Sequence, residues 1–219
     1  MRDLYFDQLD AIVDDLVAMT TSVRDAVHEA TKALLSADQN AAEAVISGDR
    51  EIDATRDLIE ERALELLATQ QPVAIDLRML VAALRMVADL ERMGDLAVHI
   101  AKVARMRLPD GAVPETERPT MSKMADVAVR MVDATARIVA DRDVDAARGL
   151  ADEDDEMDEL RRSLFLTLLS DDWSHGVEPA IDIALLGRYY ERIGDHAVSM
   201  GKRVVYFVTG ETPISADTP

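Results

Sequence analysis

The sequences ERMGDLA (residues 91–97) and ERIGDHA (residues 191–197) decide the fold, because one stretch repeats the other 100 residues further along the chain. Both lie in segments whose apolar residues recur at spacings of three and four, which predicts helices. A glycine in the middle of a helix costs about 0.5 to 1 kcal/mol relative to alanine. A glycine in both copies therefore indicates that another group approaches the helix backbone closely at this point.

The repeat extends beyond these two stretches. Two earlier helical segments share the pattern apolar, acid, apolar, base, apolar, apolar at an offset of 105 residues. An internal duplication is the economical explanation. The pattern is formed by Val45, Asp49, Ile52, Arg56, Ile59 and Ala63 in the first copy, and by Leu150, Asp154, Met157, Arg161, Leu164 and Leu168 in the second.

The chain divides into two halves with three predicted helices each, separated by the proline-rich stretch LPDGAVPETERP (residues 108–119). This predicts an all-α fold of two tandem three-helix bundles related by an internal pseudo-two-fold repeat. The first predicted helix ends near residue 35, and the second and third span residues 39–70 and 72–107. The fourth follows the linker directly, and the fifth and sixth span residues 144–171 and 177–209. The predicted parts are a first three-helix repeat (1–107), a linker (108–118), a second repeat (119–210) and a flexible C-terminal tail (211–219).

Composition restricts the classes of protein that this chain can belong to. The 219 residues are 48% hydrophobic and include no cysteine, which excludes disulfides and thiolate metal sites. The 24 Lys and Arg residues against 43 Asp and Glu residues give a net charge of -19, which disfavours nucleic acid and anionic lipid as partners. No apolar run reaches the roughly 18 residues of a membrane span. We therefore expect a cytoplasmic protein whose partners are cations or basic protein surfaces.

Each half carries two pairs of carboxylates on consecutive predicted helices. Residues four apart share a helix face, so the two members of a pair point the same way. Glu91 also stands in line with the apolar residues Leu84 and Val98, which predicts that it faces partly inward. The pairs are Asp49 with Asp53 and Glu91 with Asp95 in the first half, and Asp154 with Asp158 and Glu191 with Asp195 in the second.

Four clustered carboxylates in each half need compensation, because like charges on one helix face repel and partial burial of a charge is costly. Protonation, arginine partners and a bound cation are the possible sources. Arg56, Arg92, Arg161 and Arg192 supply two positive charges against four negative ones in each half. A multivalent cation is the stronger neutraliser, and oxygen ligands suit magnesium, manganese or iron, with zinc possible. We therefore expect divalent or trivalent metal ions at these eight carboxylates.

With these motifs the chain resembles the PhoU family, the accessory and regulatory proteins of the high-affinity phosphate transport system. The resemblance implies that the eight carboxylates are surface sites for multinuclear metal clusters, reported in the family with iron or zinc. The family usually has asparagine four residues after the motif aspartate, where this chain has His99 and Ser199. The motifs that carry the resemblance are ERMGDLA, ERIGDHA, DREID (residues 49–53), DDEMD (154–158), DLR (76–78) and VVYFVTGE (204–211).

The resemblance also implies the biological role of a regulatory adaptor. Such a protein negatively regulates phosphate uptake and phosphate-regulon signalling by coupling the phosphate ABC transporter, through its ATPase subunit, to the sensor histidine kinase. It would be cytoplasmic, would associate with the membrane peripherally through these partners, and would form a homodimer. No nucleophile with a base, phosphate-cradling glycine loop or nucleotide motif occurs in the sequence, so we expect no enzyme.

Two alternatives from other classes follow from the same residues. The first is a metal-free structural helical module that acts only through protein contacts. The second is a carboxylate-bridged di-metal oxidase, a class that commonly uses Glu-x-x-His on two helices. No glutamate of this chain has a histidine three residues later, which disfavours the oxidase.

Overall fold

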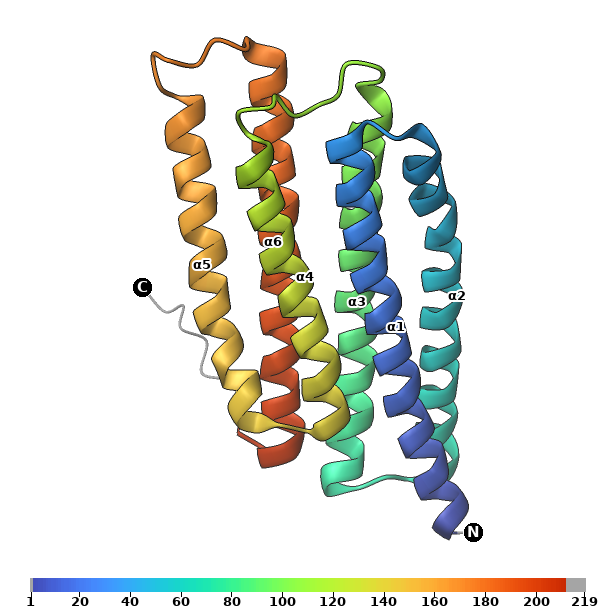
Figure 1. Ribbon diagram of the computed structural model, residues 1–219. Helices are drawn as coiled ribbons and strands as arrows, with labels where there is room; N and C mark the ends of the chain where they lie inside the picture. The colour runs from blue at the N-terminus through green and yellow to red at the C-terminus, as the bar shows by residue number, and fades with distance from the viewer. Residues whose placement is uncertain (1, 212–219) are drawn as a thin grey trace.

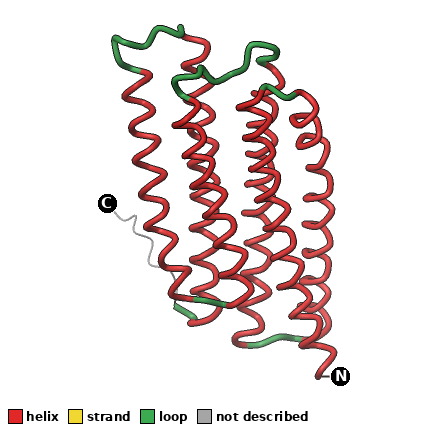
Figure 2. The backbone as a smooth tube through the Cα atoms, viewed as in Figure 1, coloured by secondary structure: helices red, strands yellow, loops and turns green. Residues whose placement is uncertain are grey.

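The computed structural model describes residues 2–211, and it consists of helices joined by loops (Figures 1 and 2). No strand occurs within these residues, and the predicted all-α class is confirmed. The tail predicted from residue 211 lies, after Glu211, outside the described residues. The helices are α1 (Arg2–Ser36), α2 (Gln39–Gln70), α3 (Ala74–Met106), α4 (Arg118–Asp141), α5 (Val144–Leu168) and α6 (Val177–Thr209).

The same cap opens the second helix of each half. Asp38 precedes α2, and its carboxylate accepts hydrogen bonds from the backbone amides two and three residues later. Asp143 does the same before α5. An aspartate at this position satisfies amides that have no partner inside the helix, which is worth about 1 kcal/mol. The internal duplication therefore includes the local signals that start the helices.

Two helix ends differ from the prediction. Helix α3 begins at Ala74 rather than at Pro72, because Val73 is extended, with φ −131° and ψ 162°. Helix α5 ends at Leu168 rather than at residue 171, because the chain turns there and the amide of Ser170 bonds to the carbonyl of Thr167 at 3.2 Å. Both differences concern a single turn at an element boundary, where helix periodicity carries little information.

The helices pack first within each half and then across the molecule. Helices α1, α2 and α3 contact one another, and α4, α5 and α6 do the same. Across the halves, α3 packs on α6 and α1 packs on α4. Figure 1 shows α3 and α6 side by side and antiparallel, since α3 runs upward and α6 downward in this view. The predicted pair of three-helix bundles is therefore confirmed, and the repeated helices α3 and α6 form a contact between them.

Small residues let α5 approach α6 closely. A Cβ atom at Gly201 would lie 2.9 Å from Cδ1 of Leu150 and 3.0 Å from the backbone oxygen of Ala147. Both Leu150 and Ala147 are buried in the core. Glycine is therefore required here for packing, and it places the acids of α5 beside α6.

None of the helices within residues 2–211 is long and apolar enough to cross a membrane.

Candidate metal centres

The first half brings its four predicted acids together across the contact between α2 and α3. We call Asp49, Asp53, Glu91 and Asp95 the first acid cluster. Burial raises the pKa of Asp49, and the nearby charges of Asp53 and Asp95 raise it further. Arg56 lies between the helices, with Nη1 3.2 Å from Asp53 Oδ1 and 3.6 Å from Glu91 Oε1. The carboxylates of the two helices therefore share one electrostatic environment.

The second half repeats this arrangement between α5 and α6. We call Asp154, Asp158, Glu191 and Asp195 the second acid cluster. Burial raises the pKa of Asp154 from 3.8 to about 6, and the charges of Asp195, Asp158 and Glu191 contribute to the rise. A carboxyl group whose pKa rises this far is held in an environment that disfavours its negative charge. The second cluster therefore has uncompensated negative charge when Asp154 is ionised.

The glycine of each repeated motif makes room for the aspartate of the neighbouring helix. A Cβ atom at Gly94 would lie 3.7 Å from Oδ1 of Asp49, and one at Gly194 would lie 3.3 Å from Oδ1 of Asp154. The close approach predicted at these glycines is confirmed: the nearest atom to the Cβ position is Cδ1 of Ile52, at 3.3 Å, at Gly94 and Sδ of Met131, at 3.2 Å, at Gly194, and a carboxylate oxygen also lies within contact distance in both halves. The motif thus brings an acid of one helix against the backbone of the next.

The two clusters differ in how arginines engage the glutamate. Glu191 is 8% exposed at its side chain, and it accepts hydrogen bonds from Arg161, at 2.8 Å, and from Arg188. Glu91 is 22% exposed, and its oxygens lie 3.6 Å from Arg56 and 3.5 Å from Arg92. The first cluster is therefore the more open one, and the glutamate of the second is enclosed by cations.

The prediction that Arg192 helps to neutralise the second acid cluster is wrong. Arg192 forms no ion pair with any residue between positions 2 and 211, and Arg188 contacts Glu191 in its place. On a helix, residues three apart are neighbours, and residue 188 lies one turn before Glu191 on the same face. Arg56, Arg92 and Arg161 do contact cluster acids as predicted.

The donor set fits a hard or borderline cation in its chemistry. All eight predicted ligands are carboxylates, which such ions prefer, and a cation would offset the burial and the neighbouring negative charges that raise the pKa of Asp49 and Asp154. In the described residues, no three Asp, Glu or His side chains stand close enough to hold one ion. Ion binding therefore requires side-chain rotation, and Glu191 must also leave Arg161 and Arg188.

The two positions where the family usually has asparagine differ in their surroundings. The ring of His99 stacks on that of Tyr189 from α6, with centroids 5.4 Å apart. Ser199 lines a cavity between α3 and α6 together with Lys202 and Arg203. Both residues thus lie beside the contact between the halves.

Buried ion pairs between the halves were not predicted from the sequence. Asp89 on α3 accepts a hydrogen bond from Nε of Arg203 at 2.7 Å, and its other oxygen lies 3.0 Å from Nδ1 of His196. Near the opposite end of the α3–α6 contact, Nε of Arg107 donates to Asp182 at 2.6 Å. The available signal was the position of each aspartate within an apolar helix face, since Asp89 follows Met86 and precedes Met93 at helical spacing.

Two copies of a three-helix unit, each with an acid cluster between its second and third helices, define a class of duplicated helical-bundle proteins. The family model "PhoU domain" matches residues 16–104 and again residues 121–204. The chain therefore belongs to the PhoU family.

Relatives in sequence and structure cover nearly the whole chain. In Mycobacterium tuberculosis (strain H37Rv), the phosphate-specific transport system accessory proteins PhoU homolog 1 and homolog 2 are 43% and 44% identical over 213 residues. These alignments cover 97% of this chain, 96% of homolog 1 and 100% of homolog 2. The crystal structure of PhoU from Pseudomonas aeruginosa matches with a TM-score of 0.86 at 29% identity, over 94% of this chain and all 100% of that one.

A second crystal structure extends the comparison. The phosphate transport system regulatory protein PhoU from Streptococcus pneumoniae matches with a TM-score of 0.85 at 25% identity, over 95% of this chain and 98% of that one. The relatives are named as accessory or regulatory proteins of phosphate transport, and the family is not one of enzymes. The chain is accordingly a regulatory or accessory protein of this type, and the oxidase alternative is set aside.

Proposed function

We propose that this protein is a metal-binding regulatory adaptor of phosphate homeostasis, with metal ions held at both acid clusters. The observation that carries the metal assignment is geometric: in each half, acids of two neighbouring helices come together where Oδ1 of Asp49 or of Asp154 lies within 4 Å of the Cβ position of the motif glycine, Gly94 or Gly194. Iron, zinc, manganese or magnesium would fit the oxygen donors. A bound ion would neutralise the carboxylates and lock α2 to α3 and α5 to α6.

The partners follow from the family's accessory and regulatory role. The protein would couple the phosphate ABC transporter, through its ATPase subunit, to the sensor histidine kinase, and so repress phosphate uptake and phosphate-regulon signalling. It would act in the cytoplasm, reach the membrane through these partners, and form a homodimer. The acidic surface supports basic protein surfaces as its contacts, because the chain carries a net charge of -19.

Elemental analysis of protein purified without chelators tests the metal assignment. The variant with Asp49→Asn, Asp53→Asn, Glu91→Gln and Asp95→Asn should lose the metal of the first half and keep that of the second. A control with Glu61→Gln and Glu65→Gln removes exposed acids from the same helix α2 outside the cluster, and it should keep all metal. Unchanged metal content in the cluster variant would refute the assignment.

A pull-down from phosphate-replete cells tests the adaptor role. The tagged protein should retain the transporter's ATPase subunit and the sensor kinase, and the cluster variants should retain less of either if metal orders the binding surface. Retention of neither partner, repeated with the purified components, would contradict the role. Light scattering on the eluted protein determines whether it is a homodimer.

A metal-free helical interaction module is the alternative, and one observation favours it. Arg161 and Arg188 already neutralise Glu191 without an ion. Stoichiometric metal in chelator-free preparations would reject this alternative, and its absence would favour it.

A further inference from the structure

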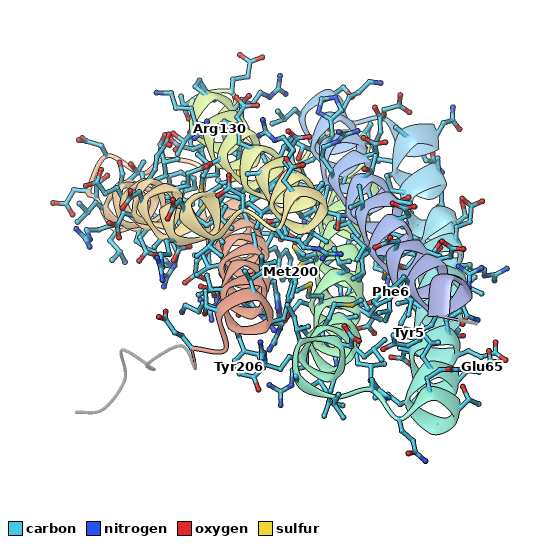
Figure 3. The ribbon with its side chains drawn as sticks, turned by 90° about the horizontal axis from the view of Figure 1, so that it is seen from below. Tyr5, Phe6, Glu65, Arg130, Met200 and Tyr206 are labelled. Carbon is cyan, nitrogen blue, oxygen red and sulfur yellow. The ribbon has the colours of Figure 1, made fainter. Side chains whose placement is uncertain are left out.

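A cavity of about 310 Å³ lies between α3 and α6, on the contact between the two halves. Its polar lining consists of Arg85 from α3 and of Ser199, Lys202, Arg203 and Tyr206 from α6. Figure 3 shows Tyr206 at the edge of the molecule beside α6, with α1 and α4 on the opposite side. The cavity has the size of a small-ligand site, which usually starts at about 300 Å³.

The charge of this cavity is opposite to that of the protein. Three cationic side chains line it and no acid does, in a chain with 43 acidic and 24 basic residues. Arg85 and Lys202 form no ion pair with any residue of the described range 2–211. Most arginines elsewhere contact a carboxylate, for example Arg56, Arg107 or Arg130. Because neither Arg85 nor Lys202 is neutralised by an acid within that range, the cavity carries positive charge.

The third cationic side chain, Arg203, is held in position by a buried carboxylate. The Nε atom of Arg203 donates to the buried carboxylate of Asp89 at 2.7 Å, and His196 contacts the other oxygen of Asp89 at 3.0 Å. This bond uses only Nε, so both Nη nitrogens of Arg203 keep their donors for another partner. A guanidinium fixed in this way is ready to bind an oxyanion at little further cost in side-chain entropy.

The fold itself does not require a basic cavity here. The internal repeat relates Arg85 to Leu185, Arg203 to Val103 and Tyr206 to Met106 at the same offset of 100 residues. Leu185 and Met106 are exposed apolar residues. The same helix crossing is therefore built at its other end without the two arginines, although Lys102 stands at the position related to Lys202. Helix packing does not explain the presence of Arg85 and Arg203.

We propose that this cavity binds a phosphate group, carried by orthophosphate or by a small phosphate monoester. Arginine and lysine are the residues that bind phosphate oxygens best, and the hydroxyls of Ser199 and Tyr206 can donate further hydrogen bonds. The apolar walls, Val81 and Ala82, can contact the carbon atoms of an ester. This site is separate from both acid clusters and needs no metal ion.

Titration calorimetry at fixed ionic strength tests the proposal, with a chelator present so that phosphate on a bound metal is not counted. The probes are sodium phosphate and glycerol 3-phosphate, each titrated into the full chain. We expect saturable binding of one ligand per chain by at least one probe. The probe that binds more tightly identifies the source of the phosphate group. If neither binds, an acidic protein surface becomes the better candidate and the proposal is overturned.

A matched pair of variants locates the binding. Arg85→Ala with Lys202→Ala removes the two unpaired cations and should weaken binding roughly tenfold or more. Lys102→Ala removes the residue that the repeat relates to Lys202, and it should leave affinity unchanged. All three side chains are exposed, so the variants should fold, which their thermal melts will check. Equal affinity in the double variant and in the Lys102→Ala control would overturn the proposal.

Discussion

The two halves of this molecule are built alike where helices of one half meet and differently where the halves meet each other. Each half places a glycine of its third helix against an aspartate of its second, at Gly94 with Asp49 and at Gly194 with Asp154. Across the α3–α6 contact the repeat diverges, because the positions related to Arg85, Arg203 and Tyr206 of the basic cavity are the apolar residues Leu185, Val103 and Met106. The difference indicates that the acid clusters belong to the repeated unit, whereas the surface between the halves was shaped separately.

The largest effect is expected at the buried aspartates between the halves. Asp89→Ala should lower the free energy of unfolding by about 2 to 4 kcal/mol, because Arg203 and His196 lose their buried partner. Asp182→Ala should cost a similar amount, because it leaves Arg107 with only the exposed Glu178 as a partner. Urea denaturation measures both. A cost below about 0.5 kcal/mol, the range of exposed ion pairs, would contradict the structural role of these pairs.

The next comparison is between the glutamates of the two clusters. Glu191→Gln should lower the free energy of unfolding in chelator by about 1 to 2 kcal/mol, because Arg161 and Arg188 lose a shared, nearly buried carboxylate. Glu91→Gln should cost less than about 0.5 kcal/mol, because its ion pairs are longer and more exposed. Equal costs in the two halves would show that the enclosure of Glu191 has no energetic consequence.

The helices and the acid faces could be predicted from the sequence, because both depend on spacing within one helix. Gly94 and Gly194 correctly indicated a close approach, since a mid-helix glycine has a local cost that needs a reason. The partners of Asp89 and Asp182 could not be predicted, because they depend on the register of α3 against α6, two antiparallel helices about 100 residues apart in the chain. The contact of Arg188 with Glu191 was available from the sequence, because residues three apart are neighbours on a helix face.

A smaller effect of opposite sign is expected from Asp154→Asn. The pKa of Asp154 in the folded state, about 6, lies above the ordinary 3.8, so above pH 6 its ionised form destabilises the metal-free protein. The amide removes this cost and should raise the free energy of unfolding at pH 8 by on the order of 1 kcal/mol, a value that allows for solvent screening.

The pH dependence of this gain identifies its cause. The gain from Asp154→Asn should shrink as the pH falls through about 6 and vanish below about pH 3, where the carboxyl is protonated in both the folded and the unfolded state. Asp49→Asn should act in the same direction in the first half, because burial and Asp53 also raise the pKa of Asp49. Urea denaturation in chelator at several pH values measures both variants. Destabilisation by either substitution at pH 8 would contradict the electrostatic account of its cluster.

The most direct measurement is anomalous diffraction from crystals grown with iron or manganese. The account predicts anomalous peaks at both acid clusters, one between α2 and α3 and one between α5 and α6, with Glu191 turned away from Arg161 and Arg188. Crystals that show no peak at either cluster, with the arginines still on Glu191, would contradict it.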